Sequence, residues 1–528
     1  MSNIKVFIAD DVNEEKLAPL REAGFTVEKE TKLDFDALAE KMKDADGVIV
    51  RSTTRITADL MDKAEKLRVI GRAGVGVDNI DVNAATQRGI VVMNAPDGNT
   101  ITTAEHTIAL LVSMARNVPQ AHAKLQSGVW DKKSFVGVEL NGKNLGVIGL
   151  GRIGKHVAGI AKGFGMKILA FDPFVSIEQA KDLGIEVGTL DEVLKQADFI
   201  TIHTPVTDET RGIIGKDAFA KMKKDVRLVN CARGGLVDES ALLEAIENGT
   251  VAAAALDVYA TEPLPTDSPL LNNPKIITTP HLGASTTEAQ EGVALTVAEQ
   301  MRDFLLSGEL RNAVNAPSLA AKDLEAFQPF IDLGEKLGRF QTQIMNENPV
   351  SAVQIEYAGE LAEKDAAPVT RAFLAGLLKD VSARVNVVNA MHIADERGIK
   401  ITTSYTQSKR STFDIRTVVS SVQGEQTASG MMFANGEGRI TEIGNFSIEV
   451  VPSGFMLLTK NKDVPGVIGK IGTLLGEAQV NISRFYLGRE AKGGEALAII
   501  EIDSPLEEKV LTDLRNLEAV NVARQVKL

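Results

Sequence analysis

Three polar side chains are placed where they could carry out acid–base chemistry on a small carboxylate. Arg233, Glu262 and His281 each follow an apolar, strand-like run, in NCARGG, ATEP and PHLGAS. Loops after parallel strands converge at the carboxyl edge of a sheet, so these residues are predicted to meet there. A histidine can take or give a hydroxyl proton near neutral pH, and a neighbouring glutamate would fix its tautomer. A guanidinium could bind a substrate carboxylate with two hydrogen bonds and polarise the adjacent carbonyl.

A glycine-rich turn precedes these residues and predicts a dinucleotide site. Gly149, Gly151 and Gly154 form GLGRIG between an apolar strand and a helix. That spacing allows a tight turn, close approach of the backbone to a pyrophosphate, and packing of the helix on the sheet. Asp172 ends the next strand and could bond the adenosine ribose hydroxyls. A carboxylate there favours NAD over NADP, because it would repel a 2′-phosphate.

Two further cations indicate an anionic substrate. Arg51 and Arg72 follow the strand-like runs VIV and LRVIG. Both could therefore line the same site and hold a dianionic phosphate.

The elements that must position these residues are mostly alternating strands and helices. Short β-branched runs alternate with helical segments from residue 4 to about 95, which predicts parallel βα units. An amphipathic stretch over about 101–126 leads into a second, doubly wound sheet within 99–286. Ser285 and Glu288 have capping-box spacing and predict the start of a helix that runs to about Leu306 and returns to the first domain.

The last 210 or so residues read differently from the rest. Residues 317–452 combine helical segments with strand runs and a hairpin signal at Asn435-Gly436, which indicates an α+β module. Residues 453–528 run strand, helix, strand, strand, helix, strand, a ferredoxin-like order expected to form a separate module. We therefore expect four domains, at 1–98 with 287–316, 99–286, 317–452 and 453–528.

Several stretches within about 45–290 together resemble the D-isomer-specific 2-hydroxyacid dehydrogenase family. They are GRAGVGVDNID, LGVIGLGRIG, HTPVTDETRGII, VNCARGGLVDE, AALDVYATEP and PHLGAST. The resemblance implies an α/β fold with a Rossmann-type NAD domain, a discontinuous flavodoxin-like substrate domain, and Arg233, Glu262 and His281 as a catalytic triad. With NAD as cofactor, it also implies contacts at Gly149, Gly151, Arg152, Ile153, Gly154, Asp172, Thr204, Cys231, Ala232, Asp257, Gly283 and Ala284.

The two added C-terminal modules are similar to those of the long-form members that act on 3-phospho-D-glycerate. This similarity implies NAD-dependent oxidation to 3-phosphooxypyruvate, the first step of serine biosynthesis. It also implies that Arg51, Arg72 and Lys132, the last in VWDKKSF, face the substrate phosphate, and that Lys132 could come from a partner subunit. Some relatives carry arginine at this third position.

The tail, FMLLTKNKDVPGVIGKIGTLLGEAQVNI, resembles an ACT domain, and the middle module resembles the intervening domain of the long form. Asp463 would attract the ammonium of an amino acid, and Asn481 would hold its carboxylate. Asn461 stands where some relatives have an aromatic or histidine side chain. We expect serine to act as a feedback effector here, and the resemblance implies a homotetramer.

Composition excludes several other classes. A net charge of −13 disfavours nucleic acid or an anionic membrane as the main partner, and no apolar run approaches about 20 residues. The single cysteine, Cys231, excludes an intrachain disulfide and a multi-cysteine zinc site, and we expect no metal. The start, MSNIKVFIAD, reads as a strand rather than a secretory peptide, so a cytoplasmic location is expected.

Two alternatives remain open at this point. One is a dehydrogenase for another D-2-hydroxy acid, including reduction of 2-oxoglutarate. The other is a non-enzymatic NAD-sensing protein similar to the corepressors that share this fold.

Overall fold

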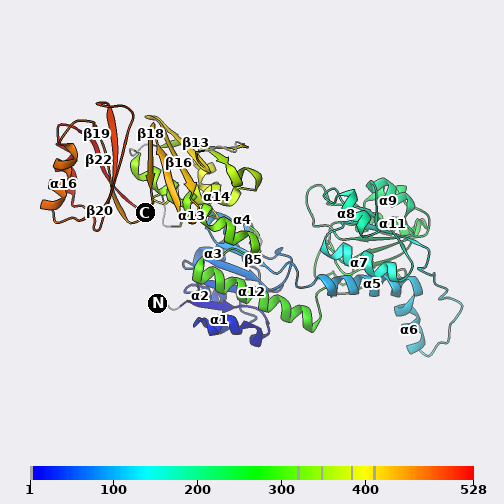
Figure 1. Cartoon of the computed structure of the whole chain (residues 1–528). Helices are drawn as coiled ribbons and strands as arrows, with labels where there is room; N and C mark the ends of the chain where they lie inside the picture. The colour runs from blue at the N-terminus through cyan, green and yellow to red at the C-terminus, as the bar shows by residue number, and fades with distance from the viewer. Residues whose placement is uncertain (1–3, 318–320, 346–348, 382–383, 408–411) are drawn as a thin grey trace.

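The computed structural model describes residues 4–317, 321–345, 349–381, 384–407 and 412–528. Figure 1 shows the substrate-domain sheet near the centre, the second parallel sheet at one end, and two mixed or antiparallel sheets at the other. The predicted α/β class is confirmed for the first two sheets, and the predicted domain boundaries stay a prediction.

The first sheet is parallel and has the order β2-β1-β3-β4-β5, which is the flavodoxin-like order. Its strands are β1 Lys5–Ile8, β2 Thr26–Lys29, β3 Gly47–Val50, β4 Val69–Arg72 and β5 Val91–Asn94. Its helices are η1 Glu14–Leu17, α1 Ala18–Glu22, α2 Phe35–Met42, α3 Ala58–Lys63, α4 Val82–Gln87 and the returning α12, Thr287–Ser307.

The return of the chain to this domain is confirmed by α12. Its residues Val297 and Met301 belong to the same apolar core as Val6 and Ile8 of β1. The predicted helix start is wrong by one residue, because Thr286 is the N-cap and accepts a hydrogen bond from the amide of Ala289. A threonine hydroxyl caps about as well as the neighbouring serine would, so spacing alone did not decide between them.

The second sheet is parallel and has the order β12-β11-β10-β9-β6-β7-β8. Its strands are β6 Asn144–Ile148, β7 Lys167–Phe171, β8 Glu186–Val187, β9 Phe199–Ile202, β10 Val226–Asn230, β11 Val251–Leu256 and β12 Ile276–Thr278. Its helices are α5 Thr100–Arg116, α6 Val118–Gln126, α7 Arg152–Gly163, α8 Ile177–Asp182, α9 Leu190–Gln196, α10 Lys216–Lys221 and α11 Glu239–Glu247. The strand order reverses at β6, between β9 and β7, where a doubly wound sheet binds its ligand.

The amphipathic stretch before β6 is two helices rather than one. Asn117 lies between them in the left-handed region, with φ +52°, and Pro119 follows. The first helix, α5, buries one face, whereas α6 has no buried residue and projects with the loop after it (Figure 1).

The third sheet is mixed, with the order β14-β13-β15-β16-β17-β18. The elements of this domain are α13 Ala321–Ile344, β13 Val350–Ala358, η2 Gly359–Glu363, α14 Ala367–Leu377, α15 Ala390–Glu396, β14 Lys400–Thr406, β15 Ile415–Ser421, β16 Gly424–Met432, β17 Gly438–Ile443 and β18 Phe446–Val450. The predicted hairpin at Asn435-Gly436 is confirmed, because it joins β16 to β17.

The fourth sheet has the ferredoxin-like order β20-β21-β19-β22. The elements of this domain are β19 Phe455–Lys462, α16 Val467–Glu477, β20 Ile482–Arg489, β21 Glu495–Ile502, α17 Glu508–Arg515 and β22 Val520–Lys527. This sheet packs against the preceding domain, because its residues Met456 and Ile499 share one apolar core with Phe340 and Phe446 of that domain, and the expected separate module stays a prediction. The helices α16 and α17 cover one face of this sheet, and the preceding domain covers the other. Burial of both faces removes more apolar surface from water than the two helices alone would remove.

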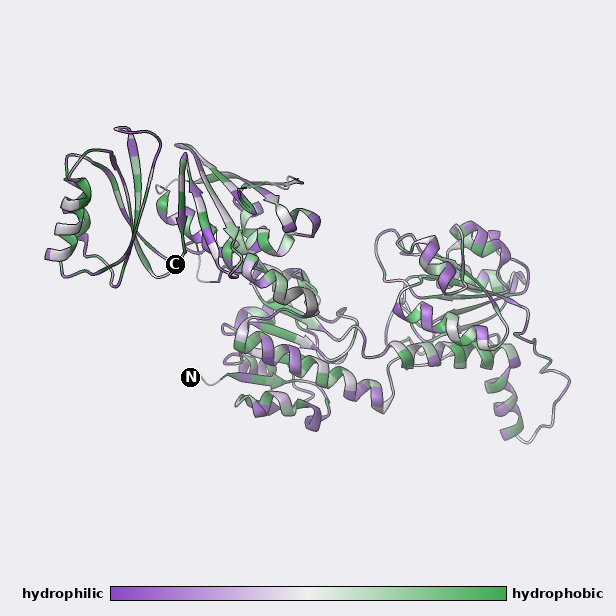
Figure 2. Ribbon diagram, viewed as in Figure 1, coloured by the Kyte–Doolittle hydropathy of each residue, from purple (hydrophilic) through white to green (hydrophobic). Residues whose placement is uncertain are grey.

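In Figure 2, helices such as α5 and α12 carry both green and purple residues, as expected of helices with one face on a sheet. Within the described ranges, no helix is long and apolar enough to cross a membrane.

Candidate functional site

A histidine–glutamate pair lies at the carboxyl edge of the second sheet. Glu262 follows β11 and His281 follows the neighbouring β12, so adjacent strands bring the two side chains together. Nδ1 of His281 lies 2.7 Å from Oε2 of Glu262, and the amide of Tyr259 donates to Oε1 of the same carboxylate at 3.0 Å. The backbone of His281 is left-handed, with φ +54°, in a loop that presents the ring to this glutamate.

The charge of Glu262 decides which nitrogen of His281 faces the substrate. Burial by itself raises the pKa of Glu262, but the hydrogen bonds from His281 and from the Tyr259 amide outweigh it and hold the pKa below its ordinary value. An ionised carboxylate only accepts hydrogen bonds, so Nδ1 must donate. Nε2 is then the nitrogen left to exchange a proton with a substrate hydroxyl.

Hydrogen bonds to the carboxylate of Asp257 hold the loop that carries His281. This carboxylate, almost fully buried, accepts hydrogen bonds from the Thr279 hydroxyl at 2.6 Å and from the amides of Leu282 and Gly283 at 2.7 and 2.8 Å. Nε2 of His106, on α5, lies 3.2 Å from the same carboxylate. Burial raises the pKa of Asp257, but these hydrogen bonds more than offset it, and the pKa is lowered. Sequence reasoning named Asp257 as a cofactor contact and missed this positioning role.

Arg233 follows β10 and contacts the other domain. Its Nη1 donates to the carbonyl of Ala232 at 2.7 Å, and its Nε lies 3.5 Å from the carboxylate of Asp78. A Cβ on Gly76 would come within 2.4 Å of the guanidinium, so this glycine makes room for it. Arg233 therefore stands at the junction of the two parallel sheets.

Arg72 and Arg51 lie on the substrate-domain side of this junction. Burial, followed by the nearby charges of Arg233 and Arg51, lowers the pKa of Arg72 to about 10. The guanidinium of Arg72 folds back over Gly74, where any Cβ would overlap it at 1.4 Å. The structure thus gathers three of the predicted cations, and a cluster of like charges is stabilised by an anion.

A buried aspartate organises the Arg51 loop. Asp10, which follows β1, accepts hydrogen bonds from the amides of Arg51 and Thr54 and from the Thr54 hydroxyl. The side-chain amide of Asn79 donates to the carbonyl of Arg51 at 2.7 Å. These groups were not singled out from the sequence, although Asp10 also follows an apolar strand.

The three glycines of the predicted fingerprint have three different surroundings. Gly149 has φ +93°, and a Cβ there would lie 2.6 Å from the carbonyl oxygen of His203. A Cβ on Gly154 would lie 2.1 Å from the carbonyl of Gly149, so the helix packs directly on the turn. Gly151, the N-cap of α7, faces open space. Open space at a helix N-terminus suits a pyrophosphate, so the turn fits NAD.

Two side chains near the glycine turn, Asp172 and Thr204, also suit a bound NAD. Asp172 accepts hydrogen bonds from the amides of Leu150 and Phe174 at 2.7 and 2.9 Å, which places its carboxylate beside the glycine turn. The hydroxyl of Thr204 is buried and has no hydrogen-bond partner among the described residues. A buried donor without a partner costs about 1–3 kcal/mol, which a bound ligand would recover.

The other predicted cofactor residues lie around the same edge. Burial raises the pKa of the Cys231 thiol to about 12, so its side chain stays neutral. Arg152 is paired with Asp97 of the interdomain segment at 2.8 Å. The remaining four, half-buried or buried, are Ile153, Ala232, Gly283 and Ala284. Their roles as cofactor contacts stay predictions.

Lys132 is not brought to the arginines of its own chain. It lies on the exposed loop after α6, next to Trp130, whose side chain is 83% exposed (Figure 1). Its contact with the substrate phosphate stays a prediction.

The three residues predicted to bind serine do not form one site within a single chain. Asn461 is buried and donates to the carbonyl of Lys462, and Asp463 accepts from Arg489 and from the amide of Gly493. Asn481 lies beyond the far end of α16, about 16 Å along the helix, and donates to Asp503.

No group of three or more His, Cys, Asp or Glu side chains in the described part of the chain is placed to hold a metal ion.

Comparisons with known proteins place this arrangement in a family. Residues 108–283 match the D-isomer specific 2-hydroxyacid dehydrogenase NAD binding domain, residues 326–444 the D-3-phosphoglycerate dehydrogenase intervening domain, and residues 455–519 the ACT domain. Among solved structures, the TT0316 protein from Thermus thermophilus is 36% identical with a TM-score of 0.55, over 59% of this chain and 100% of that one. A glyoxylate reductase from Paecilomyes thermophila is 31% identical with a TM-score of 0.55, over 60% of this chain and 99% of that one.

The curated relatives match along the whole length. A D-3-phosphoglycerate dehydrogenase of Bacillus subtilis is 42% identical over 99% of both chains. One of Archaeoglobus fulgidus is 44% identical over 99% of this chain and 100% of its own. The chain, with its glycine turn, histidine–glutamate pair and two added modules, belongs to the D-3-phosphoglycerate dehydrogenase family of D-isomer specific 2-hydroxyacid dehydrogenases.

Proposed function

We propose that this chain oxidises 3-phospho-D-glycerate to 3-phosphooxypyruvate with NAD. The observation that carries the proposal is the gathering of Arg51, Arg72 and Arg233 at the domain junction, where Arg233 follows β10 at the same carboxyl edge that bears the His281–Glu262 pair. A substrate with a carboxylate at one end and a phosphate at the other needs cations at both ends and a base between them. The full-length match to relatives named for this substrate supports the same assignment.

Each residue of the pair and the cluster has a separate task. Arg233 binds the carboxylate and polarises the C2 oxygen, and Arg51 and Arg72 hold the phosphate. Nε2 of His281 removes the C2 hydroxyl proton, and Glu262 keeps Nδ1 protonated and stabilises the resulting cation. The glycine turn and Asp172 would hold NAD, which would supply the acceptor for the hydride at C2. Loss of the hydroxyl proton to His281 and of that hydride would together leave a carbonyl at C2.

Serine regulation through the tail and assembly into a homotetramer belong to the same proposal. Asp463 and Asn481 are separated by the length of α16, so two copies of the tail would complete one serine site. The exposed loop of Lys132 likewise fits an assembly in which a partner subunit supplies this cation. We also propose that the protein is cytoplasmic.

The His281→Ala variant tests the proposed chemistry. General acid–base catalysis contributes about 10²- to 10⁴-fold, so NADH formation from 3-phospho-D-glycerate should fall by that factor. Binding of NADH, followed by its fluorescence, should change little because the glycine turn is untouched. Turnover equal to that of the unaltered chain would overturn the assignment.

A further inference from the structure

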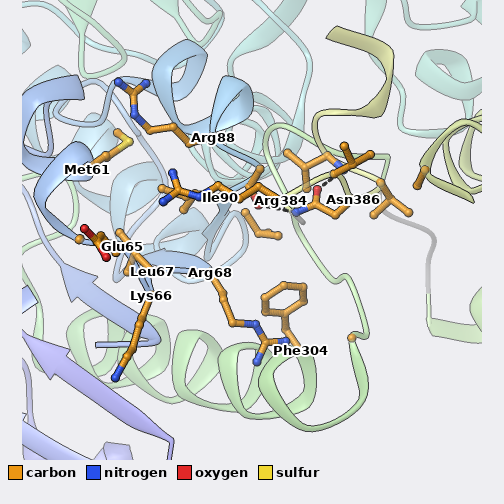
Figure 3. Close-up of a pocket in the computed structure, with 18 of the residues that line it drawn as sticks. Met61, Glu65, Lys66, Leu67, Arg68, Arg88, Ile90, Phe304, Arg384 and Asn386 are labelled. Carbon is orange, nitrogen blue, oxygen red and sulfur yellow. Dashed lines mark hydrogen bonds between the residues drawn. The ribbon is translucent and has the colours of Figure 1, made fainter. Parts of the chain in front are cut away.

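A cavity of about 500 Å³ lies between the substrate domain and the domain after it (Figure 3). The substrate domain supplies residues 64–68 and 88–91 to its wall, together with Phe304 and Gly308 at the end of α12. The following domain closes it with α14 and residues 384–388.

The cavity lies at the opposite edge of the sheet from the proposed active site. Arg68 immediately precedes β4, whose last residue is Arg72. Four residues of strand span about 13 Å, so a ligand at Arg68 is separate from one held by Arg72. Residues 88–91 likewise precede or begin β5. The two sites would be linked by the short strands β4 and β5.

The cavity wall is cationic within an acidic chain. Its cations are Lys66, Arg68, Arg88, Lys379 and Arg384. Figure 3 shows Arg68 and Arg88 reaching the wall from the substrate domain and Arg384 from the domain that follows. Two carboxylates, Glu65 and Glu335, also line the described wall. An excess of positive charge in a concave site raises the local concentration of anions.

Arg88 and Lys66 already have carboxylate partners. Arg88 makes a two-pronged pair with Asp62 at 2.8 and 2.9 Å, and Lys66 lies 3.5 Å from Asp44. Arg68, by contrast, is held over the ring of Phe304, with its guanidinium carbon 5.5 Å from the ring centre. Such a contact orients the cation without neutralising it.

Lys379, on the opposite wall of the cavity, supplies a second positive charge that is not paired with a carboxylate among the described residues. Its ammonium donates to the carbonyl of Val385, at 3.5 Å. Across the described ranges, neither Arg68 nor Lys379 has a carboxylate within ion-pair distance.

The facing wall is fixed to the substrate domain rather than loosely apposed. The side-chain amide of Asn386 donates to the carbonyl of Gly89 at 2.8 Å, and Val388 belongs to the same apolar core as Val91. Gly89 has φ +70°, and a Cβ there would lie 2.6 Å from the Asn386 amide nitrogen. A ligand in the cavity would therefore contact two domains whose spacing is already set.

We propose that this cavity is a second anion site, which takes a small phosphate-bearing anion between Arg68 on one wall and Lys379 on the other. The proposal does not depend on the substrate assigned above, because none of these residues belongs to the proposed active site.

Equilibrium dialysis of the full chain against radiolabelled inorganic phosphate, at constant ionic strength set by chloride, tests this proposal. The Arg68→Gln/Lys379→Gln variant should lose one bound phosphate per chain, or bind it at least about tenfold more weakly, because it lacks two of the charges that hold the anion. A matched control, Lys195→Gln on the exposed face of α9, should bind as the unaltered chain does.

A second variant separates this site from the proposed active site. The single variant Arg72→Gln should still bind phosphate in the cavity at Arg68. The triple variant Arg68→Gln/Lys379→Gln/Arg72→Gln should also lose any phosphate that the double variant still binds at the proposed active site. Identical phosphate isotherms for the unaltered chain and the Arg68→Gln/Lys379→Gln variant would overturn the proposal. NADH binding by both variants, measured in parallel, shows that they are folded.

Discussion

At the scale of single residues, the site consists of pairs in which one side chain sets the state of another. Glu262 fixes the tautomer of His281, and Asp10 fixes the loop that carries Arg51. The sequence predicted His281, Glu262 and Arg233 because each follows an apolar run that must be a strand. It did not predict Asp10, because an aspartate after a strand has no distinguishing signal until the neighbouring loop is folded against it.

Asp257 provides a pH-dependent prediction at this scale. Its native pKa is lowered, so the unfolded chain binds more protons than the native one as the pH falls below the unfolded value of about 3.9. The stabilisation by Asp257 is therefore present above that pH and is lost as the pH falls through the lower native pKa. At neutral pH, Asp257→Asn should reduce the free energy of unfolding by about 1–3 kcal/mol, because one of its two acceptor oxygens becomes an NH2 group that faces a donor.

Urea titrations at neutral pH and near pH ~3 measure this effect, since the second value lies below the unfolded pKa. The difference between the unaltered chain and Asp257→Asn should shrink in acid. The exposed Asp267→Asn serves as a control and should unfold as the unaltered chain does at both pH values. A difference in the free energy of unfolding that grows in acid would contradict the predicted pH dependence.

At the scale of elements, the βα units carry the site and were the most predictable part. Periodicity and the order of polar residues were enough to place β6, α7 and β7. A glycine turn between an apolar strand and a helix is compatible with few structures other than a nucleotide-binding βαβ unit. The strand β13, Val350–Ala358, was not predicted, since its alternating pattern continues directly from a long helix. The position of Lys132 was beyond sequence reasoning, because it depends on where α6 projects.

Two glycines of α7 give a matched prediction for the cofactor turn. Gly154→Ala would place a methyl group 2.1 Å from the carbonyl of Gly149, so the helix must shift away from the turn. We expect NADH affinity to fall by at least about tenfold, measured by fluorescence titration. Gly159→Ala, on the same helix, meets nothing within 4 Å. It should keep NADH affinity and raise the free energy of unfolding by up to about 1 kcal/mol. Equal loss of affinity in both variants would contradict the packing argument.

At the scale of the whole molecule, the last two domains pack against each other through a shared apolar core. The shared core of Met456, Ile499, Phe340 and Phe446 means that the tail cannot be removed without exposing apolar surface. Sequence patterns missed this because a sheet with one face buried looks the same whichever element covers it.

A chain ending at residue 452 should therefore bind a hydrophobic dye and unfold at a lower urea concentration than the full chain. The measurement is dye fluorescence and a urea titration of both chains, side by side. Equal dye binding and an equal unfolding midpoint would contradict the shared core.

Serine regulation is better tested in the full chain with Asp463→Asn, which removes the charge proposed to attract the ammonium. We expect serine inhibition of NADH formation to weaken at least about tenfold, and the exposed Asp513→Asn of the same domain to leave it unchanged. Unaltered inhibition in Asp463→Asn would remove this residue from the effector site.

The central claim is that the cations at the domain junction select a phosphorylated hydroxy acid. The most direct test compares kcat/KM for 3-phospho-D-glycerate and for D-glycerate in the unaltered chain and in Arg72→Gln. Loss of charge-assisted hydrogen bonds should lower kcat/KM for the phosphorylated substrate about 10- to 100-fold and leave that for D-glycerate nearly unchanged. An unaltered chain that does not favour the phosphorylated substrate, or an Arg72→Gln variant that loses both activities equally, would contradict the claim.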